Sequence, residues 1–131
     1  MIYLLDTDIV IYWIKGNRNI SKNIISVGFN NISSSIITKT ELLYGAYKSQ
    51  NVEKNLETIH KLSKKMQFLD FSDSCQHIYA RIKVGLVSKG MILDDLDTMI
   101  AATAIAYDLI LVTNNSRHFS RIPNLIIENW V

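Results

Sequence analysis

The 131-residue chain contains little cysteine, proline, glycine or histidine: one, one, five and three residues respectively. A single cysteine, Cys75, excludes a disulfide framework and a cysteine-only metal cage, and the histidines lack the spacing of a zinc site. The longest apolar run, residues 99–107, is interrupted by Thr103 and is too short to span a membrane. Because no signal-peptide pattern is present either, we expect a cytoplasmic protein that makes no use of a membrane.

Apolar residues make up 48% of the chain and charged residues 20%, which is enough apolar material for a core and excludes disorder. The length predicts a single domain over residues 1–131. The formal net charge of +2 is too small to indicate nucleic-acid binding by itself.

Short apolar runs alternate with stretches of helical periodicity along the chain. We expect strands over residues 2–5, 32–37, 68–71, 109–112 and 125–127. The expected helices cover residues 9–15, 21–27, 38–47, 51–66, 72–88 and 94–107. This alternation predicts an α/β domain of three layers, in which helices cover both faces of a mostly parallel sheet.

Acidic residues stand where ligands bind in such sheets, beyond the carboxyl ends of the strands. Asp6 follows the first predicted strand, Glu41 lies early in the helix after the second, and Asp97 begins the helix before the fourth. We expect these acids to share an oxygen-rich, histidine-free pocket, which would select a hard cation such as Mg²⁺ or Mn²⁺. Further candidates at the same edge are Asp8, Asp94, Asp95, Thr113, Asn114 and Asn115.

Each acid also has a purely structural explanation. Thr38 and Glu41 fit a capping box, and Asp6, Asp94 or Asp95 could each cap a helix. Two features favour the pocket.

Asp97 precedes Ile100, Ala101 and Ala104 at spacings of three, four and seven, so its carboxylate lies on the apolar face of its helix. Gly45 follows Glu41 by one turn, and the missing side chain would let another element approach closely.

Four segments, taken together and in order, resemble the PIN-domain ribonucleases of the VapC toxin type. They are YLLDTDIVIYWIKG, TKTELLYGAYKS, DDLDTMIAATAIAYDLILVTNN and HFSRIPNLIIENW, and they cover nearly the whole chain. The resemblance implies that Asp6, Glu41 and Asp97 are the catalytic and metal-binding acids. It also implies a fourth position at Asn115, which is acidic in many members of the family and carries no charge here. Asp8, Asp94 and Asp95 are additional acids that either compensate for the missing charge or only cap a helix.

The same resemblance implies a Mg²⁺- or Mn²⁺-dependent endoribonuclease that cleaves tRNA or ribosomal RNA, pairs with a cognate antitoxin and forms a homodimer. Without the five acids at positions 6, 41, 94, 95 and 97, seven acidic side chains remain against 14 basic ones, a net charge of +7 that suits RNA. Candidate phosphate contacts are Lys15, Lys39, Arg117 and Arg121.

Three other readings stay open at this point. A haloacid-dehalogenase-like phosphatase would use the Asp-x-Asp of YLLDTDIV, although its second pair of acids should follow Thr113 and here precedes it. A receiver-like signalling module would use an aspartate such as Asp70. A PIN-like module could bind RNA or a partner without catalysis. Tyr12, Trp13, Tyr44 and Tyr47 fit either a partner or dimer surface or the core.

Overall fold

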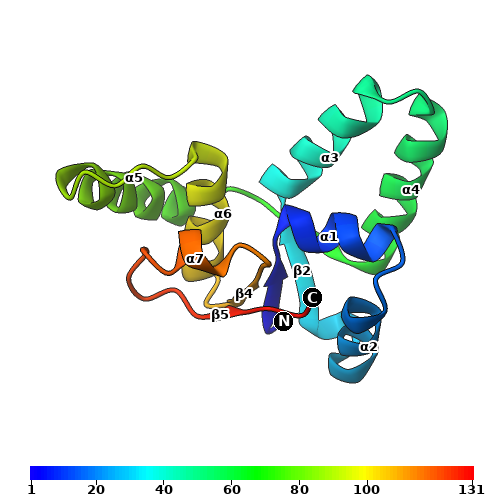
Figure 1. Ribbon diagram of the computed structural model, residues 1–131, viewed down its shortest axis with the longest axis horizontal. Helices are drawn as coiled ribbons and strands as arrows, with labels where there is room; N and C mark the ends of the chain where they lie inside the picture. The colour runs from blue at the N-terminus through cyan, green and yellow to red at the C-terminus, as the bar shows by residue number, and fades with distance from the viewer.

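A five-stranded parallel sheet forms the centre of the molecule. The computed structural model describes residues 1–131, and Figure 1 shows the sheet between two groups of helices. The strands lie in the order β3-β2-β1-β4-β5, and all four pairings are parallel. Their bounds are β1 (Tyr3–Leu5), β2 (Ile32–Ser35), β3 (Gln67–Leu69), β4 (Ile110–Val112) and β5 (Ile127–Glu128).

Helices connect each strand to the next, as the predicted alternation required. They are α1 (Thr7–Ile14), α2 (Arg18–Val27), α3 (Ile36–Lys48), α4 (Val52–Lys65), α5 (Asp73–Ser88), α6 (Asp95–Ala106) and α7 (Ser116–Phe119), with one 3₁₀ turn, η1 (Phe29–Asn31). The three-layer α/β prediction is therefore confirmed. None of these helices combines the length and the apolar character that crossing a membrane requires.

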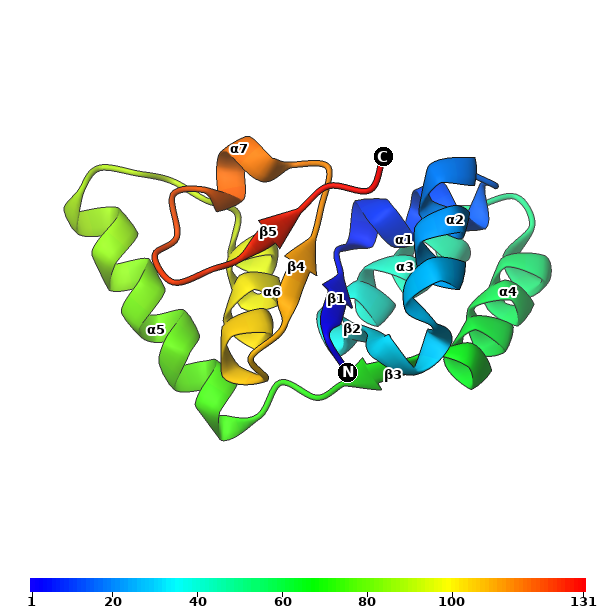
Figure 2. The same ribbon diagram turned by 90° about the horizontal axis from the view of Figure 1, so that it is seen from below.

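The two faces of the sheet bury two separate cores. Successive residues of a strand point to opposite faces, so Leu4 and Leu5 enter different cores, as do Leu111 and Val112. Leu5 and Val112 pack with residues of α1 to α4, whereas Leu4 and Leu111 pack with α6 and with Phe119 of α7. Figure 2 shows this division, with α1 to α4 on one side of the sheet and α5 to α7 on the other.

The boundary between β2 and α3 differs from the prediction. The second strand was expected to continue through Ile37, but it ends at Ser35, whose side chain accepts a hydrogen bond from the Thr38 amide and caps α3. The predicted capping box of Thr38 and Glu41 is therefore wrong, because Ser35 takes that role. The structure also contains α7, which the sequence pattern did not predict.

The strands β1, β2 and β4 end at one edge of the sheet. The Asp6 amide continues the β1–β4 ladder by donating to the Val112 carbonyl over 2.9 Å. The Thr113 amide likewise donates to the Glu128 carbonyl over 2.9 Å. The fold thus brings the residue that follows β1 beside the residue that follows β4.

Candidate active site

Asp6 belongs to a cluster of acids at this edge, which also contains Asp8, Glu41 and Asp97 and which we call the pocket. It is only 4% exposed, and both carboxylate oxygens have partners. Oδ1 accepts a hydrogen bond from the Thr7 amide over 2.8 Å, so Asp6 also caps α1. Oδ2 accepts a hydrogen bond from the Thr113 hydroxyl over 2.7 Å. The predicted strand-end position of Asp6 is therefore correct, and its capping role coexists with a place in the pocket.

Asp8 stands beside Asp6 on the first turn of α1. Its Oδ2 accepts a hydrogen bond from the Asn114 amide over 3.2 Å. Its Oδ1 is buried and has no hydrogen-bond partner. Because an unpartnered buried carboxylate oxygen is costly, this atom is a vacant acceptor in a polar pocket.

Glu41 reaches the pocket from the second turn of α3. Its Oε1 accepts a hydrogen bond from the Thr7 hydroxyl over 2.8 Å, and that hydroxyl also lies 2.9 Å from the hydroxyl of Thr38. Thr7 therefore ties α1 to α3 at the point where both enter the pocket. Thr7 is not among the site residues predicted from the sequence, although it stands between the two acids of the Asp-Thr-Asp segment.

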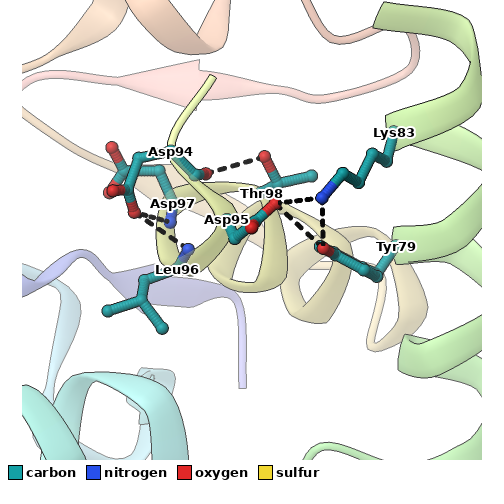
Figure 3. Close-up of polar contacts among 7 residues, drawn as sticks. All are labelled: Tyr79, Lys83, Asp94, Asp95, Leu96, Asp97 and Thr98. Carbon is teal, nitrogen blue, oxygen red and sulfur yellow. Dashed lines mark hydrogen bonds and ion pairs between the residues drawn. The ribbon is translucent and has the colours of Figure 1, made fainter. Parts of the chain in front are cut away.

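Three neighbouring acids stand at the start of α6 and make different contacts, as Figure 3 shows. Asp94 caps the helix, accepting hydrogen bonds from the Leu96 and Asp97 amides over 2.9 and 3.3 Å. Asp97 is half-buried and belongs to the pocket. Asp95 turns toward α5, where its Oδ1 lies 2.9 Å from both Lys83 Nζ and the Tyr79 hydroxyl. Asp95, a candidate from the sequence, is therefore not one of the pocket acids.

The pKa values of Asp6 and Asp97 show that neighbouring carboxylates repel one another electrostatically. Burial, together with the neighbouring Asp8 and Asp97, raises the pKa of Asp6 to about 8, although the hydrogen bonds from Thr113 and Thr7 oppose the shift. Burial also raises the pKa of Asp8, while the hydrogen bond from the Asn114 amide lowers it.

Burial, with Asp94 and Glu41, raises the pKa of Asp97 to about 6. His118, exposed on α7, lowers the pKa of Asp97 by its charge. No hydrogen bond or ion pair joins His118 to these acids, so the expectation of a histidine-free pocket stays a prediction.

The donor set suits a hard divalent cation. Every pocket acid offers carboxylate oxygen, Asp8 Oδ1 has no partner, and a bound cation would lower the raised pKa values. No three acidic, histidine or cysteine side chains already stand close enough to enclose an ion. The assignment of Asp6, Glu41 and Asp97 as ligands therefore stays a prediction.

The four predicted phosphate contacts lie in different places. Lys15 ends α1 and lines a groove of about 470 Å³ together with Glu41 and Gly45. Lys39 lies over the Phe68 ring, 5.7 Å from its centroid. Arg117 is exposed on α7, and Arg121 follows α7 in the connection to β5.

Two further expectations concern α1 and α3. A side chain added at Gly45 would meet no atom within 4 Å, so the expected close approach of another element is wrong, and Gly45 opens the groove instead. Trp13 packs against Phe29, with ring centroids 6.1 Å apart, and contacts the core. Tyr44 and Tyr47 are 68% and 66% exposed, so core packing does not explain them.

Residues 3–125 match the family described as PIN domain. That match covers most of the chain and includes every pocket acid. The chain therefore belongs to the PIN-domain family.

Relatives named VapC match the chain over nearly its full length. Ribonuclease VapC2 of Rickettsia felis is 41% identical over 99% of this chain and 98% of the relative. The tRNA(fMet)-specific endonuclease VapC of Salmonella typhimurium is 34% identical over 98% of this chain and 97% of the relative.

Solved structures agree with these matches. A DNA-bound VapBC complex from Salmonella typhimurium aligns with a TM-score of 0.95 at 33% identity, covering 100% of this chain and 99% of that one. VapBC2 from Rickettsia felis, bound to a fragment of its promoter, aligns with a TM-score of 0.92 at 39% identity over 100% of both chains. The phosphatase and receiver alternatives are excluded by these matches.

Proposed function

We propose that the protein is a divalent-metal-dependent endoribonuclease and the toxin of a toxin–antitoxin pair. The observation that carries this proposal is the pocket at the strand ends, where Asp6, Asp8, Glu41 and Asp97 converge from the end of β1, α1, α3 and α6. There Asp8 and Asp97 raise the pKa of Asp6, and Glu41 and Asp8 raise the pKa of Asp97. The names of the full-length relatives, ribonuclease VapC2 and tRNA(fMet)-specific endonuclease VapC, support the reaction class.

Asp6 and Asp97 would hold a Mg²⁺ or Mn²⁺ ion, with Glu41 beside them and Asp8 Oδ1 as a further vacant oxygen. A bound cation of this kind lowers the pKa of water and stabilises charge that develops on phosphate oxygens. Thr113 and the Thr7 amide hold the Asp6 carboxylate in one orientation from two sides. These bonds favour the charged form of Asp6, which ligation requires.

Glu41 is suited to orient the attacking water. The Thr7 hydroxyl fixes Oε1, and Oε2 has no hydrogen-bond partner in the structure. An acceptor held in this way can direct a water molecule toward the scissile phosphate. Asn115, whose amide donates to the Thr113 hydroxyl over 3.0 Å, adds an uncharged polar group on the opposite side.

The proposed substrate is RNA, with tRNA as the first candidate and ribosomal RNA as the second. The Salmonella typhimurium relative carries tRNA(fMet) in its name. Lys15 lies in the groove beside Glu41 and is the best placed of the four predicted phosphate contacts.

The proposed partner is a cognate antitoxin, because the aligned structures are VapBC complexes. The groove beside Glu41 is lined by Ile11 and Ile14 of α1, which are 37% and 42% exposed, and offers an apolar surface at the mouth of the pocket. Occupation of this groove would cover the acids. A homodimer, expected from the sequence resemblance, stays a prediction.

Cleavage assays on tRNA and ribosomal RNA test the proposal. The purified protein should cleave with Mg²⁺ or Mn²⁺ and lose activity in EDTA. Asp6→Asn and Asp97→Asn should abolish cleavage while leaving the circular dichroism spectrum unchanged. Cleavage that resists EDTA would refute metal dependence, and RNA binding without cleavage would support a non-catalytic module.

A further inference from the structure

A basic surface that is separate from the groove beside Glu41 lies on the outer flank of the molecule. The connection from α7 to β5 runs toward α5 (Figure 2), and the two segments line a cavity of about 390 Å³ that we call the flank groove. Ile78 and Ile82 of α5 contribute to its apolar floor, and Arg81, Lys89 and Arg121 line it as well. No acidic side chain lines the groove.

The cations of α5 stand in a row. Arg81, Gly85 and Lys89 are four residues apart, so they lie one above the other on a single face of the helix. Gly85 leaves a gap between the two charges, since a side chain added there would meet no atom within 4 Å. Glycine inside a helix costs about 1 kcal/mol relative to alanine, and packing does not require it here. Its effect is to keep the groove open between Arg81 and Lys89.

These cations are not neutralised within the protein. The structure contains two ion pairs, His77–Asp73 and Lys83–Asp95, and neither involves a groove residue. Lys83 lies on the same helix but pairs with Asp95 of α6. The positive charge of α5 is therefore balanced where the helix faces Asp95 and unbalanced along the groove, which is the charge distribution of an anion-binding surface.

The groove begins close to the acid pocket. Arg121 Nη1 donates to the Ile92 carbonyl over 3.4 Å, which ties the loop after α7 to the loop before α6. Arg121 follows His118 by three residues, and three residues span at most about 11 Å. His118 in turn acts on Asp97 by its charge. An RNA strand that leaves the pocket past α7 would meet Arg121, which lies just after this helix and lines the flank groove together with Lys89 and Arg81.

We propose that the flank groove binds the phosphodiester backbone of the RNA substrate, outside the cleavage site. This inference rests on the proposed ribonuclease function and adds a binding site to it. One arginine guanidinium group can donate two parallel hydrogen bonds to a phosphate. The apolar floor between the cations accommodates the face of a base or ribose. The row of charges matches a linear polyanion, and the absence of a lining carboxylate favours RNA over an ordinary mixed-charge protein surface.

RNA binding by a non-cleaving protein tests the groove. In an Asp6→Asn background, tRNA affinity is measured by fluorescence anisotropy over a series of salt concentrations. The triple change Arg81→Gln, Lys89→Gln and Arg121→Gln should weaken binding at least tenfold and reduce the slope of log K against log salt by roughly two, because each phosphate contact contributes about 0.7 to 0.9. The matched control removes three exposed cations from α4, by Lys54→Gln, Lys61→Gln and Lys64→Gln, and should leave the slope nearly unchanged.

A change of shape without a change of charge provides a second test. Gly85→Leu fills the gap between Arg81 and Lys89 and adds a better helix former, so the fold should keep or gain stability while RNA binding weakens. Affinity equal to that of the control in both the triple variant and Gly85→Leu overturns the inference.

Light scattering and co-purification with the antitoxin separate the other possible occupants. If the triple variant binds RNA normally but loses self-association or the antitoxin, the groove belongs to a protein partner and the inference is wrong. If the unmodified protein fails to cleave RNA with any divalent metal, the proposed function itself fails. Normal metal-dependent cleavage together with unaffected RNA binding by the triple variant overturns only the groove.

Discussion

The hydroxyl of Thr113 donates a hydrogen bond to Oδ2 of Asp6 over 2.7 Å, although 107 positions separate the two residues. The bond joins the ends of β4 and β1, the two strands that meet at the centre of the sheet. It also opposes the effect of burial, since it lowers the pKa of Asp6, which burial and the neighbouring acids nevertheless raise to about 8. The protein thus keeps Asp6 buried and still able to ionise.

Metal affinity should depend on pH because protons compete for Asp6 and Asp97. Their pKa values, about 8 and about 6, predict that Mn²⁺ affinity rises between roughly pH 5 and pH 8. Thr113→Val removes a bond that favours the charged form, so the rise should move to higher pH. Calorimetric titration across this range measures the effect, with Thr40→Val, an exposed site on α3, as the control. A pH-independent affinity would contradict the proton competition.

The same pKa shift predicts how the metal-free protein responds to pH. Between the unfolded value of 3.8 and the folded value of about 8, the folded state binds more protons at Asp6, so stability falls as pH rises through this window. Asp6→Asn removes the carboxylate. In EDTA at pH 8 it should raise the melting temperature by roughly 5 °C, because about 1 kcal/mol shifts a domain of this size by several degrees. At pH 4 the difference should shrink, and an equal gain at both pH values would show that charge is not the cause.

Thr7→Val tests the tie between α1 and α3. The substitution keeps the shape of the side chain but removes the donor to Glu41 Oε1, so Glu41 should lose its fixed orientation. We expect cleavage to fall about 10- to 100-fold, the usual effect of losing such a support. The comparison variant is Thr40→Val, which lies on α3, the helix of Glu41, and bonds only to the Ile36 carbonyl. Rates that match in the two variants would remove Thr7 from the positioning of Glu41.

Asp95→Asn and Asp97→Asn form a matched pair, because the two acids lie two residues apart on α6 and point in different directions (Figure 3). Asp97→Asn should abolish cleavage. Asp95→Asn weakens only the contact with Lys83 and Tyr79, so metal titration and cleavage should match the unmodified protein. A loss of metal affinity in Asp95→Asn would show that Asp95 is one of the metal-binding acids after all.

Asn115→Asp restores an acid at a position that is uncharged in this chain. If the missing charge limits metal binding, the variant should bind Mn²⁺ more tightly and cleave at a lower metal concentration. Titration of both proteins with Mn²⁺ measures this. Equal affinities would indicate that Asp8 or Asp94 already supplies the charge.

Local pattern was sufficient to predict the parallel sheet and the strand-end position of Asp6, because apolar runs and the acids that end them are adjacent in sequence. Local pattern did not predict the orientation of a side chain or the end of an element where a residue distant in sequence determines it. Asp94 and Asp95 are equivalent as sequence, and Lys83 on another helix draws Asp95 away. The end of β2 depends on which serine of residues 33–35 caps α3. Thr7 bonds to Glu41 across 34 positions, a contact that no local spacing encodes.

The central position of β1 has a consequence for synthesis of the protein. Thr113, which follows β4 and completes the surroundings of Asp6, is made 107 residues after Asp6. At about 5 to 20 residues per second, this interval is roughly 5 to 20 seconds. During this interval a nascent chain carries Asp6 without the Thr113 hydroxyl, and a chain that stops before Thr113 has no complete pocket. The order of the strands therefore delays completion of the pocket until β4 has been made.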